Sequence, residues 1–184
     1  MEDAGRIRRG YFVAGVGATQ FALPPALDLL RSLREPPEHA ESLVLAATDP
    51  ANPYGTILQW PALGQESAGR GPTRSVGALV ILVNGALAAY ISRGARQLLA
   101  WLPEDEPQRS QVARALGERL AHLAEDQVAR APVLIGEING IAASEHPLAD
   151  FLVDAGFYPS AMGFQIRRSA RAPEVPLATA DRRA

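Results

Sequence analysis

The chain has 184 residues, of which 47% are hydrophobic and 21% charged, so it can bury a core as one domain or at most two small ones. It contains no Cys, which excludes disulfides, thiolate metal sites and a Cys nucleophile. All 18 basic residues are Arg, which excludes a P-loop or Schiff-base lysine, and the net charge of −2 predicts no general attraction to nucleic acid.

The N-terminal part predicts a strand and a helix. Residues 11–16 have the composition of a short strand, and residues 19–23 extend it beyond a Gly-rich bend. Pro24-Pro25 opens an amphipathic helix, because proline is tolerated in the first helical turn. Pro36-Pro37 then ends that helix.

The middle of the chain predicts an antiparallel meander. An apolar strand at 42–47 is followed by an ordered Pro- and Asn-rich loop at 48–55. Further on, two β-rich runs flank Asn84-Gly85, which indicates a type I′ hairpin because both turn residues must take positive φ. With a third strand at 97–101, residues 76–101 form the meander.

The last third predicts two helices and two strands. Leucines at helical spacing predict a long helix over residues 104–130. A strand at 132–138, a turn at 139–140, a short helix at 148–155 and a final strand at 164–167 follow.

Strands in runs and few helices indicate an α+β protein rather than alternating α/β units. We expect a small antiparallel β-barrel or a strongly curved sheet with two or three packed helices, because closure removes exposed strand edges. The domain is expected to span residues 6–168. Residues 169–184 lack periodicity and are expected to form a flexible tail.

Positive charge is concentrated in two segments. Residues 70–101 carry four Arg and no acidic residue, and residues 160–184 carry five Arg and two acidic residues. Both segments surround predicted strands, and an antiparallel sheet with one wet face can display such Arg as a patch. The alternative is that these Arg are scattered solubility charges.

Aromatic residues near Arg give a second sign of nucleic-acid binding, since such platforms hold single strands by stacking and charge. Tyr90 and Trp101 are expected to pack in the core. Trp60 lies in a Pro-flanked loop and is the best candidate for an exposed platform.

No motif singles out a catalytic residue or a metal site. Gly15-Val16-Gly17 lacks the third glycine of a dinucleotide loop, and no Walker A, H-E-x-x-H or G-x-S-x-G motif occurs. The three His are far apart in the sequence, so no metal is expected. Asp49 could act as a general base at a cleft, or its carboxylate could accept backbone N–H bonds in an Asx turn.

The sequence also carries no sign of membrane insertion. No run of about 18 apolar residues occurs, so no transmembrane helix is expected. The N-terminus lacks the apolar core of a signal peptide. We therefore expect a cytoplasmic protein with no membrane partner.

Several stretches of unusual composition resemble the C-terminal region of the large helicase-related proteins (Lhr). The resemblance covers about residues 6–168. In chain order, the stretches are RRGYFV at 8–13, QFALP at 20–24, AATDPANPYG at 46–55, Trp60-Pro61, GALV at 77–80, Asn84-Gly85, Arg93-Gly94, Gly156-Phe157 and GFQIRR at 163–168.

The resemblance implies a place in a larger enzyme. In that family this region follows two RecA-like motor domains and winged-helix modules of an ATP-dependent helicase, which translocates on single-stranded DNA and unwinds duplexes, including RNA:DNA hybrids. The distal region is similar to a β-barrel module of AlkZ-type DNA glycosylases. ATP and Mg would belong to the motor domains, because this chain has no Walker A and no DEAH-type box. We expect no cofactor in this chain.

The first hypothesis is an accessory nucleic-acid-binding module without motor residues, acting on single-stranded DNA or an RNA:DNA hybrid. Its Arg would contact phosphates, which position a strand without reading its sequence. They would form one stripe if the first and last strands were neighbours. The candidate contact residues are Arg6, Arg8, Arg9, Trp60, Arg74, Arg93, Arg96, Arg167 and Arg168.

Two other functions stay open. A DNA glycosylase-like repair module would need a pocket for a flipped base and a carboxylate or amide that activates water, for which Asp49 and Gln20 are guesses. An assembly module would pack against the winged-helix or RecA-like domains of the parent helicase, or join copies of this chain in a homo-oligomer.

Overall fold

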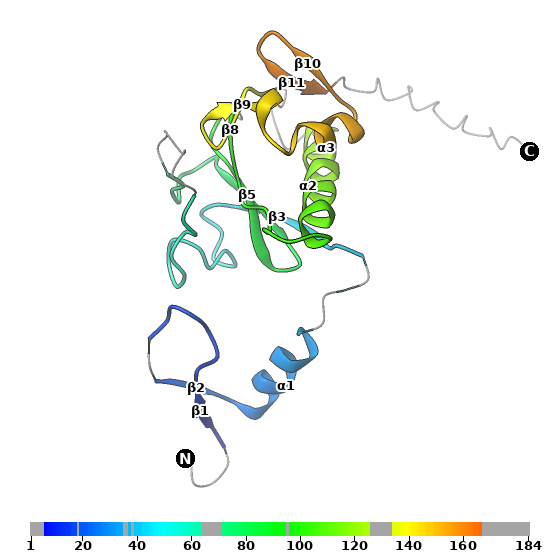
Figure 1. Cartoon of the computed structure of the whole chain (residues 1–184). Coiled ribbons are helices and arrows are strands. Elements are labelled where there is room, and N and C mark those ends of the chain that lie inside the picture. The colour runs from blue at the N-terminus through cyan, green and yellow to red at the C-terminus, as the bar shows by residue number, and fades with distance from the viewer. Residues whose placement is uncertain are drawn as a thin grey trace, which may run out of the picture.

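The computed structural model describes residues 6–17, 19–34, 37, 39–63, 71–94, 96–125 and 134–166. Figure 1 shows a hairpin and a helix at the N-terminal end, followed by a larger body of sheet and helices. The elements are β1 (Arg8–Gly10), β2 (Gln20–Ala22), α1 (Pro24–Ser32), β3 (Ser42–Ala46), β4 (Leu79–Val83), β5 (Ala86–Ile91), β6 (Gln97–Ala100), α2 (Gln108–Glu125), β7 (Leu134–Ile135), β8 (Glu137–Ile138), β9 (Ile141–Ala142), the 3₁₀ turn η1 (Ala143–Glu145), α3 (Ala149–Asp154), β10 (Phe157–Ser160) and β11 (Gly163–Ile166).

The N-terminal hairpin is closed by a side chain. β1 pairs antiparallel with β2, which confirms the predicted strand at 19–23, but residues 11–16 form the loop between them and not a strand. Gln20 Oε1 accepts the N–H groups of Phe12 at 2.9 Å and Val13 at 2.8 Å, and Nε2 donates to the carbonyls of Val13 at 2.8 Å and Gly17 at 3.2 Å. The loop backbone bonds to an amide side chain, a partner that strand composition does not reveal.

Helix α1 begins at Pro24 as predicted and has no buried residue. Leu29, Leu30 and Leu33 are 61%, 44% and 69% exposed. The stripe that predicted an amphipathic helix consists of Ala26, Leu27, Leu30 and Leu33, and only Leu27 of these is half-buried, so the described residues leave most of it uncovered.

The largest sheet has six strands in the order β3-β4-β5-β6-β8-β9. The predicted meander is confirmed, since β4, β5 and β6 pair antiparallel and Asn84 and Gly85 take φ values of 50° and 80° at the β4–β5 turn. The connection that contains α2 brings β8 parallel to β6, because a parallel neighbour needs such a crossover. The sheet is therefore mixed.

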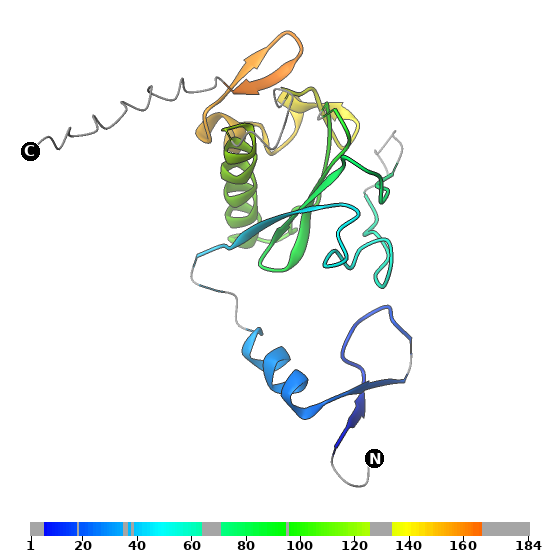
Figure 2. The same cartoon turned by 180° about the vertical axis from the view of Figure 1, so that it is seen from behind.

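The expected barrel, or strongly curved antiparallel sheet, is wrong, although the class is α+β. Among the described strands this sheet is open, with β3 and β9 at its edges. Helix α2 covers one face (Figures 1 and 2), and the loop that contains Tyr54 and Trp60 packs on the other. The apolar side chains of both faces are buried under other elements, so the sheet does not need to close around them.

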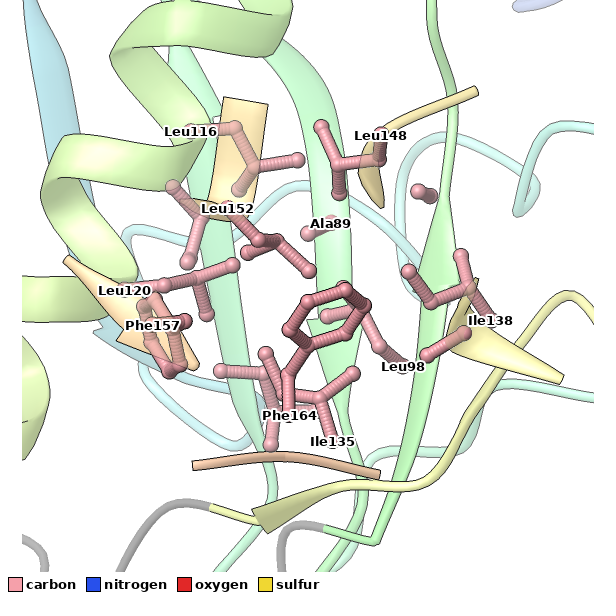
Figure 3. Close-up of a cluster of buried hydrophobic side chains, with 14 of the residues drawn as sticks. Ala89, Leu98, Leu116, Leu120, Ile135, Ile138, Leu148, Leu152, Phe157 and Phe164 are labelled. Carbon is pink, nitrogen blue, oxygen red and sulfur yellow. The ribbon is translucent and has the colours of Figure 1, made fainter. Parts of the chain in front are cut away.

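A second, smaller sheet has the order β10-β11-β7 and completes the main core. Leu116 and Leu120 from α2 meet Leu152 from α3, Phe157 from β10 and Phe164 from β11 (Figure 3). All five side chains are at most 4% exposed. This cluster joins the two sheets through α2 and α3.

The other predictions for the last third are confirmed in part. The helix predicted over 104–130 is α2, the helix over 148–155 is α3, and the final strand is β11. The strand predicted over 132–138 is divided between β7 and β8, and β10 was not predicted. Residues 167–184 lie outside the described part, so the tail and the single domain over 6–168 stay predictions. Among the described residues, no helix has the length and apolar character needed to cross a bilayer.

Candidate nucleic-acid interface

A cavity of about 690 Å³ lies between the β5–β6 turn and the β10–β11 turn. Arg93 and Arg96 line it from the first turn, and both are exposed. Met162 lines it from the second turn and is 60% exposed. The cavity therefore offers two cations beside an apolar side chain, which suits a phosphate backbone with an attached base.

The backbone of Arg96 is hydrogen-bonded beside β8. The carbonyl of Arg96 accepts the N–H groups of Gly136 at 3.1 Å and Glu137 at 3.3 Å, which fixes the turn to β8. Gln97 Nε2 donates to Glu137 Oε2 at 3.2 Å. That interaction occupies the carboxylate with an amide, and Arg93 and Arg96 stay exposed to an incoming anion.

Arg74 has a structural position instead. Its Nη1 donates to the carbonyls of Asn52 at 2.8 Å and Tyr54 at 3.1 Å, and its Nη2 donates to the carbonyl of Asp49 at 3.0 Å. The guanidinium thus satisfies three carbonyls of one loop and is half-buried. It is placed to hold that loop rather than a phosphate.

Trp60 and Asp49 also belong to the structure of this loop. Trp60 is half-buried, stacks on Tyr54 with ring centroids 6.1 Å apart and meets the edge of Tyr90 at 5.8 Å. Asp49 Oδ1 accepts the N–H of Ala51 at 2.8 Å, which confirms the Asx-turn alternative. The predicted platform is therefore packed on at least one face.

The N-terminal Arg do not join the others in one stripe. Arg6, Arg8 and Arg9 are exposed on the β1–β2 hairpin, which is a sheet of its own. Among the described strands, β1 and β11 belong to different sheets, so the first and last of them are not neighbours as a continuous stripe requires. Arg167 and Arg168 lie outside the described residues.

Sequence reasoning missed a second cavity, of about 390 Å³, beside the end of β6. Trp101, Arg109, Asn139 and His146 line it together with Glu104. The Asn-Gly turn at 139–140 was predicted, but no sequence signal connects Asn139 to a histidine seven residues later. Their proximity depends on the fold.

Polar contacts hold the walls of this cavity in place. Trp101 Nε1 donates to the carbonyl of Pro61 at 3.3 Å. Arg109 Nε donates to the carbonyl of Pro103 at 2.9 Å and its Nη2 donates to that of Glu104 at 2.7 Å. The indole and the guanidinium are therefore oriented before any ligand binds.

His146 lines this cavity and has a shifted pKa. Burial lowers its pKa below the usual value, because burial disfavours the charged imidazolium. Its Nδ1 accepts the N–H of Leu148 at 3.1 Å, and its Nε2 lies 3.5 Å from Asn139 Nδ2. No group of three or more potential metal ligands occurs in the described part of the chain.

Comparisons with known proteins relate this sequence to the Lhr proteins. A family model for the winged-helix domain of large helicase-related protein matches residues 1–42. The chain is 40% identical over 178 residues to the Lhr helicase/probable uracil glycosylase of Mycolicibacterium smegmatis, an alignment covering 90% of this chain and 11% of the relative. This chain is related to a C-terminal segment of the Lhr proteins.

A second Lhr relative agrees. The Lhr helicase/uracil glycosylase of Escherichia coli is 36% identical over 166 residues, covering 89% of this chain and 10% of that protein. The resemblance inferred from the motifs is thus confirmed. The chain spans about a tenth of the length of these Lhr relatives, so it corresponds to one region of a much longer polypeptide.

Proposed function

We propose that this chain is an accessory nucleic-acid-binding module of an Lhr-type ATP-dependent helicase, without motor residues of its own. It would hold single-stranded DNA or an RNA:DNA hybrid in the cytoplasm, while the RecA-like domains and the winged-helix parts beyond residues 1–42 supply the remaining contacts. ATP and Mg would act in those motor domains, and this chain would need no cofactor. Copies of the chain could also assemble with one another.

The observation that supports this proposal most is the cavity with Arg93 and Arg96. Both cations line this cavity, and the backbone of Arg96 is anchored beside β8 through its carbonyl. Phosphates near the two guanidinium groups would be positioned without base recognition. Met162 is exposed on the same cavity and offers an apolar surface to a base or sugar.

Fluorescence anisotropy of a labelled single strand, titrated at several salt concentrations, tests the proposal. We expect affinity to fall steeply with salt. Removing both guanidinium groups in R93A/R96A should reduce the slope of log K against log salt by about 1.4, since each lost phosphate contact contributes about 0.7 for single strands. The same titration with an RNA:DNA hybrid compares the two partners.

Arg114 provides the matched control. It is exposed on α2, away from the cavity residues, and R114A removes the same charge as either single variant. R114A should therefore bind as the unmodified chain does, whereas R93A and R96A should each bind more weakly. Equal weakening in all three would show only a net-charge effect, and no binding at low salt would refute the proposal.

A second candidate function is removal of a nucleobase from DNA. Both Lhr relatives carry uracil glycosylase in their names. The cavity of about 390 Å³ beside Trp101 is of a size to receive one flipped base, and Glu104 is a carboxylate among its lining residues. Gln20 and Asp49 instead bond to nearby backbone groups, Gln20 through both ends of its amide.

Release of uracil from a uracil-containing single strand tests this second function. Water would add to the sugar C1′ as the base departs, which leaves an abasic site that alkali cleaves. We expect cleavage with the uracil strand and none with a matched thymine strand, and E104Q should reduce the rate at least tenfold if that carboxylate activates water. No cleavage above a protein-free control would eliminate this function and leave the binding role intact.

A further inference from the structure

Two hydrogen-bond donors meet at the second cavity, on His146 and Asn139. The N–H of Leu148 donates to His146 Nδ1 at 3.1 Å, so Nδ1 must keep its lone pair. A neutral ring then carries its proton on Nε2. Nε2 is therefore a donor, and it belongs to a residue that lines the cavity.

A second donor lies close to that nitrogen. Asn139 Nδ2 lies 3.5 Å from His146 Nε2. The amide cannot turn its oxygen towards the ring, because Oδ1 accepts the N–H of Ala100 at 2.8 Å and Nδ2 donates to the Ala100 carbonyl at 2.8 Å. The shorter bonds fix the orientation, and the 3.5 Å contact is at the long limit for a hydrogen bond.

Both nitrogens therefore have an N–H available for an acceptor. Nδ2 has two N–H groups and uses one on Ala100. One oxygen placed against both nitrogens would satisfy the remaining Nδ2 proton and the Nε2 proton together.

We propose that His146 and Asn139 form a two-donor site for the carbonyl oxygen of a planar nucleobase, whose ring lies in the cavity beside Trp101. The proposal rests on the proposed nucleic-acid function and names the chemistry that this cavity recognises. The Trp101 ring is oriented by its bond to Pro61 and supplies the apolar wall. Arg109 lines the same cavity with its Nη1 group not engaged in the bonds given above, and is placed for an adjoining phosphate.

The neutral state of the ring supports the same arrangement. Burial lowers the pKa of His146, so the ring is uncharged near neutral pH. Protonation would place a hydrogen on Nδ1 against the Leu148 N–H and would break that bond. Glu104 and Arg109 are the charged groups that line this cavity with it.

The tautomer can be measured directly. Two-bond 15N–1H correlation spectra of the labelled full chain at pH 7.5 should show the His146 ring with its proton on Nε2. A ring protonated on Nδ1 would overturn the proposal, because Nε2 would then be an acceptor for Asn139.

Free uracil, which carries carbonyl oxygens on a planar ring, is the binding probe, and the parent ring pyrimidine, which has none, is the control ligand. Titration to millimolar uracil should produce saturable shifts of the Ala100, Asn139 and Leu148 amides, with at least tenfold weaker binding of pyrimidine. Equal binding of the two rings, or no saturable shift with uracil, would overturn the proposal.

Two variants separate the role of the Nε2 donor from that of the Nδ1 acceptor, which holds the N–H of Leu148. H146N places an amide oxygen near the Nδ1 position and keeps an acceptor for Leu148, but it lacks the distal donor, so uracil should bind at least tenfold more weakly. H146Q places an amide nitrogen near the Nε2 position and should restore binding to within a few-fold. Binding by H146N equal to that of the unmodified chain would overturn the proposal.

The strand-binding experiment keeps the two proposals distinguishable. If uracil does not bind while single-stranded DNA still binds in a salt-dependent way, the carbonyl site alone is refuted. If neither binds, the nucleic-acid function is refuted with it.

Discussion

The side chain of Asn139 hydrogen-bonds both backbone groups of Ala100, accepting its N–H at 2.8 Å and donating to its carbonyl at 2.8 Å. Ala100 is the last residue of β6 and is 5% exposed. Leu98 and Ile138 are the last residues paired between β6 and β8. Beyond them, the side chain of Asn139 takes the place of a strand backbone and bonds to Ala100. The same contacts orient its amide at the second cavity.

Replacing Asn139 should destabilise the fold mainly because the hydrogen bonds of its side-chain amide are lost, and less because of backbone strain. Asn139 takes a φ of 53°, which glycine adopts freely, so N139G keeps the turn but leaves the buried N–H of Ala100 without its partner. We expect a loss of about 1–3 kcal/mol in the free energy of unfolding, measured by urea denaturation. N139A should lose about 1–2 kcal/mol more because of backbone strain, and an N139G chain as stable as the parent would contradict the role of the amide.

Arg74 is predicted to matter for stability and not for strand binding. R74K keeps the positive charge, but one ammonium group cannot reproduce the planar geometry that serves the carbonyls of Asp49, Asn52 and Tyr54. The free energy of unfolding should fall by about 1–3 kcal/mol. DNA affinity of the folded variant should stay within twofold of the parent, and a larger loss of affinity would place Arg74 in the interface after all.

Substitution of Gly117 is predicted to lower the stability of the protein, although alanine is normally favoured over glycine inside a helix. A Cβ at this position would lie 2.8 Å from the carbonyl oxygen of Phe151, where α2 crosses α3. Alanine in a helix interior gains about 1 kcal/mol over glycine, but forcing the helices apart costs about 1–3 kcal/mol. G117A should therefore have a lower melting temperature than the parent, and a raised melting temperature would show that α3 can shift without loss.

Local signals in the sequence predicted local structure well. Asn84-Gly85 predicted a type I′ turn, and the observed φ values of 50° and 80° confirm it, because the turn type depends on those two residues alone. Pro24 likewise marked the start of α1. The motifs that resembled Lhr proteins identified the family for a similar reason, since they are contiguous in the chain.

The sequence could not predict features that depend on contacts between distant segments. Whether the sheet closes depends on what covers its faces, and the packing of α2 on one face and of the loop of Tyr54 and Trp60 on the other is a tertiary feature that local composition does not reveal. The same limit hid the second cavity. β9 pairs with β8 and so brings His146 back to Asn139, but the cavity also needs Leu63 and Ala100 from earlier segments of the chain.

Arginines show this limit most clearly. Arg74 and Arg93 both belong to the locally basic segment 70–101 and have the same charge. One bonds to three backbone carbonyls, and the other is exposed on a cavity. Charge counting treats them as equivalent, and only the fold separates a structural guanidinium from one available to a phosphate.

Stability should depend on pH through His146. Its pKa is lowered in the folded protein by burial, whereas in the unfolded chain it has the ordinary value near 6.5, so the unfolded state binds more protons between the two. The contribution of the neutral ring is therefore fully present above pH 6.5 and is lost progressively as the pH falls towards the folded pKa. Urea denaturation at pH 7.5 and pH 5.5 should show this loss in the parent chain.

H146N isolates that effect from the other titratable groups of the chain. The variant retains an acceptor for the N–H of Leu148 but has no imidazole at position 146, so its stability should change less between the two pH values. The difference between the two chains measures His146 alone, provided that Glu104 and Arg109 keep their positions around the cavity. Identical pH dependence in the parent and in H146N would mean that the ring is solvated enough to be protonated without cost, and the two-donor arrangement would then lose its electrostatic basis.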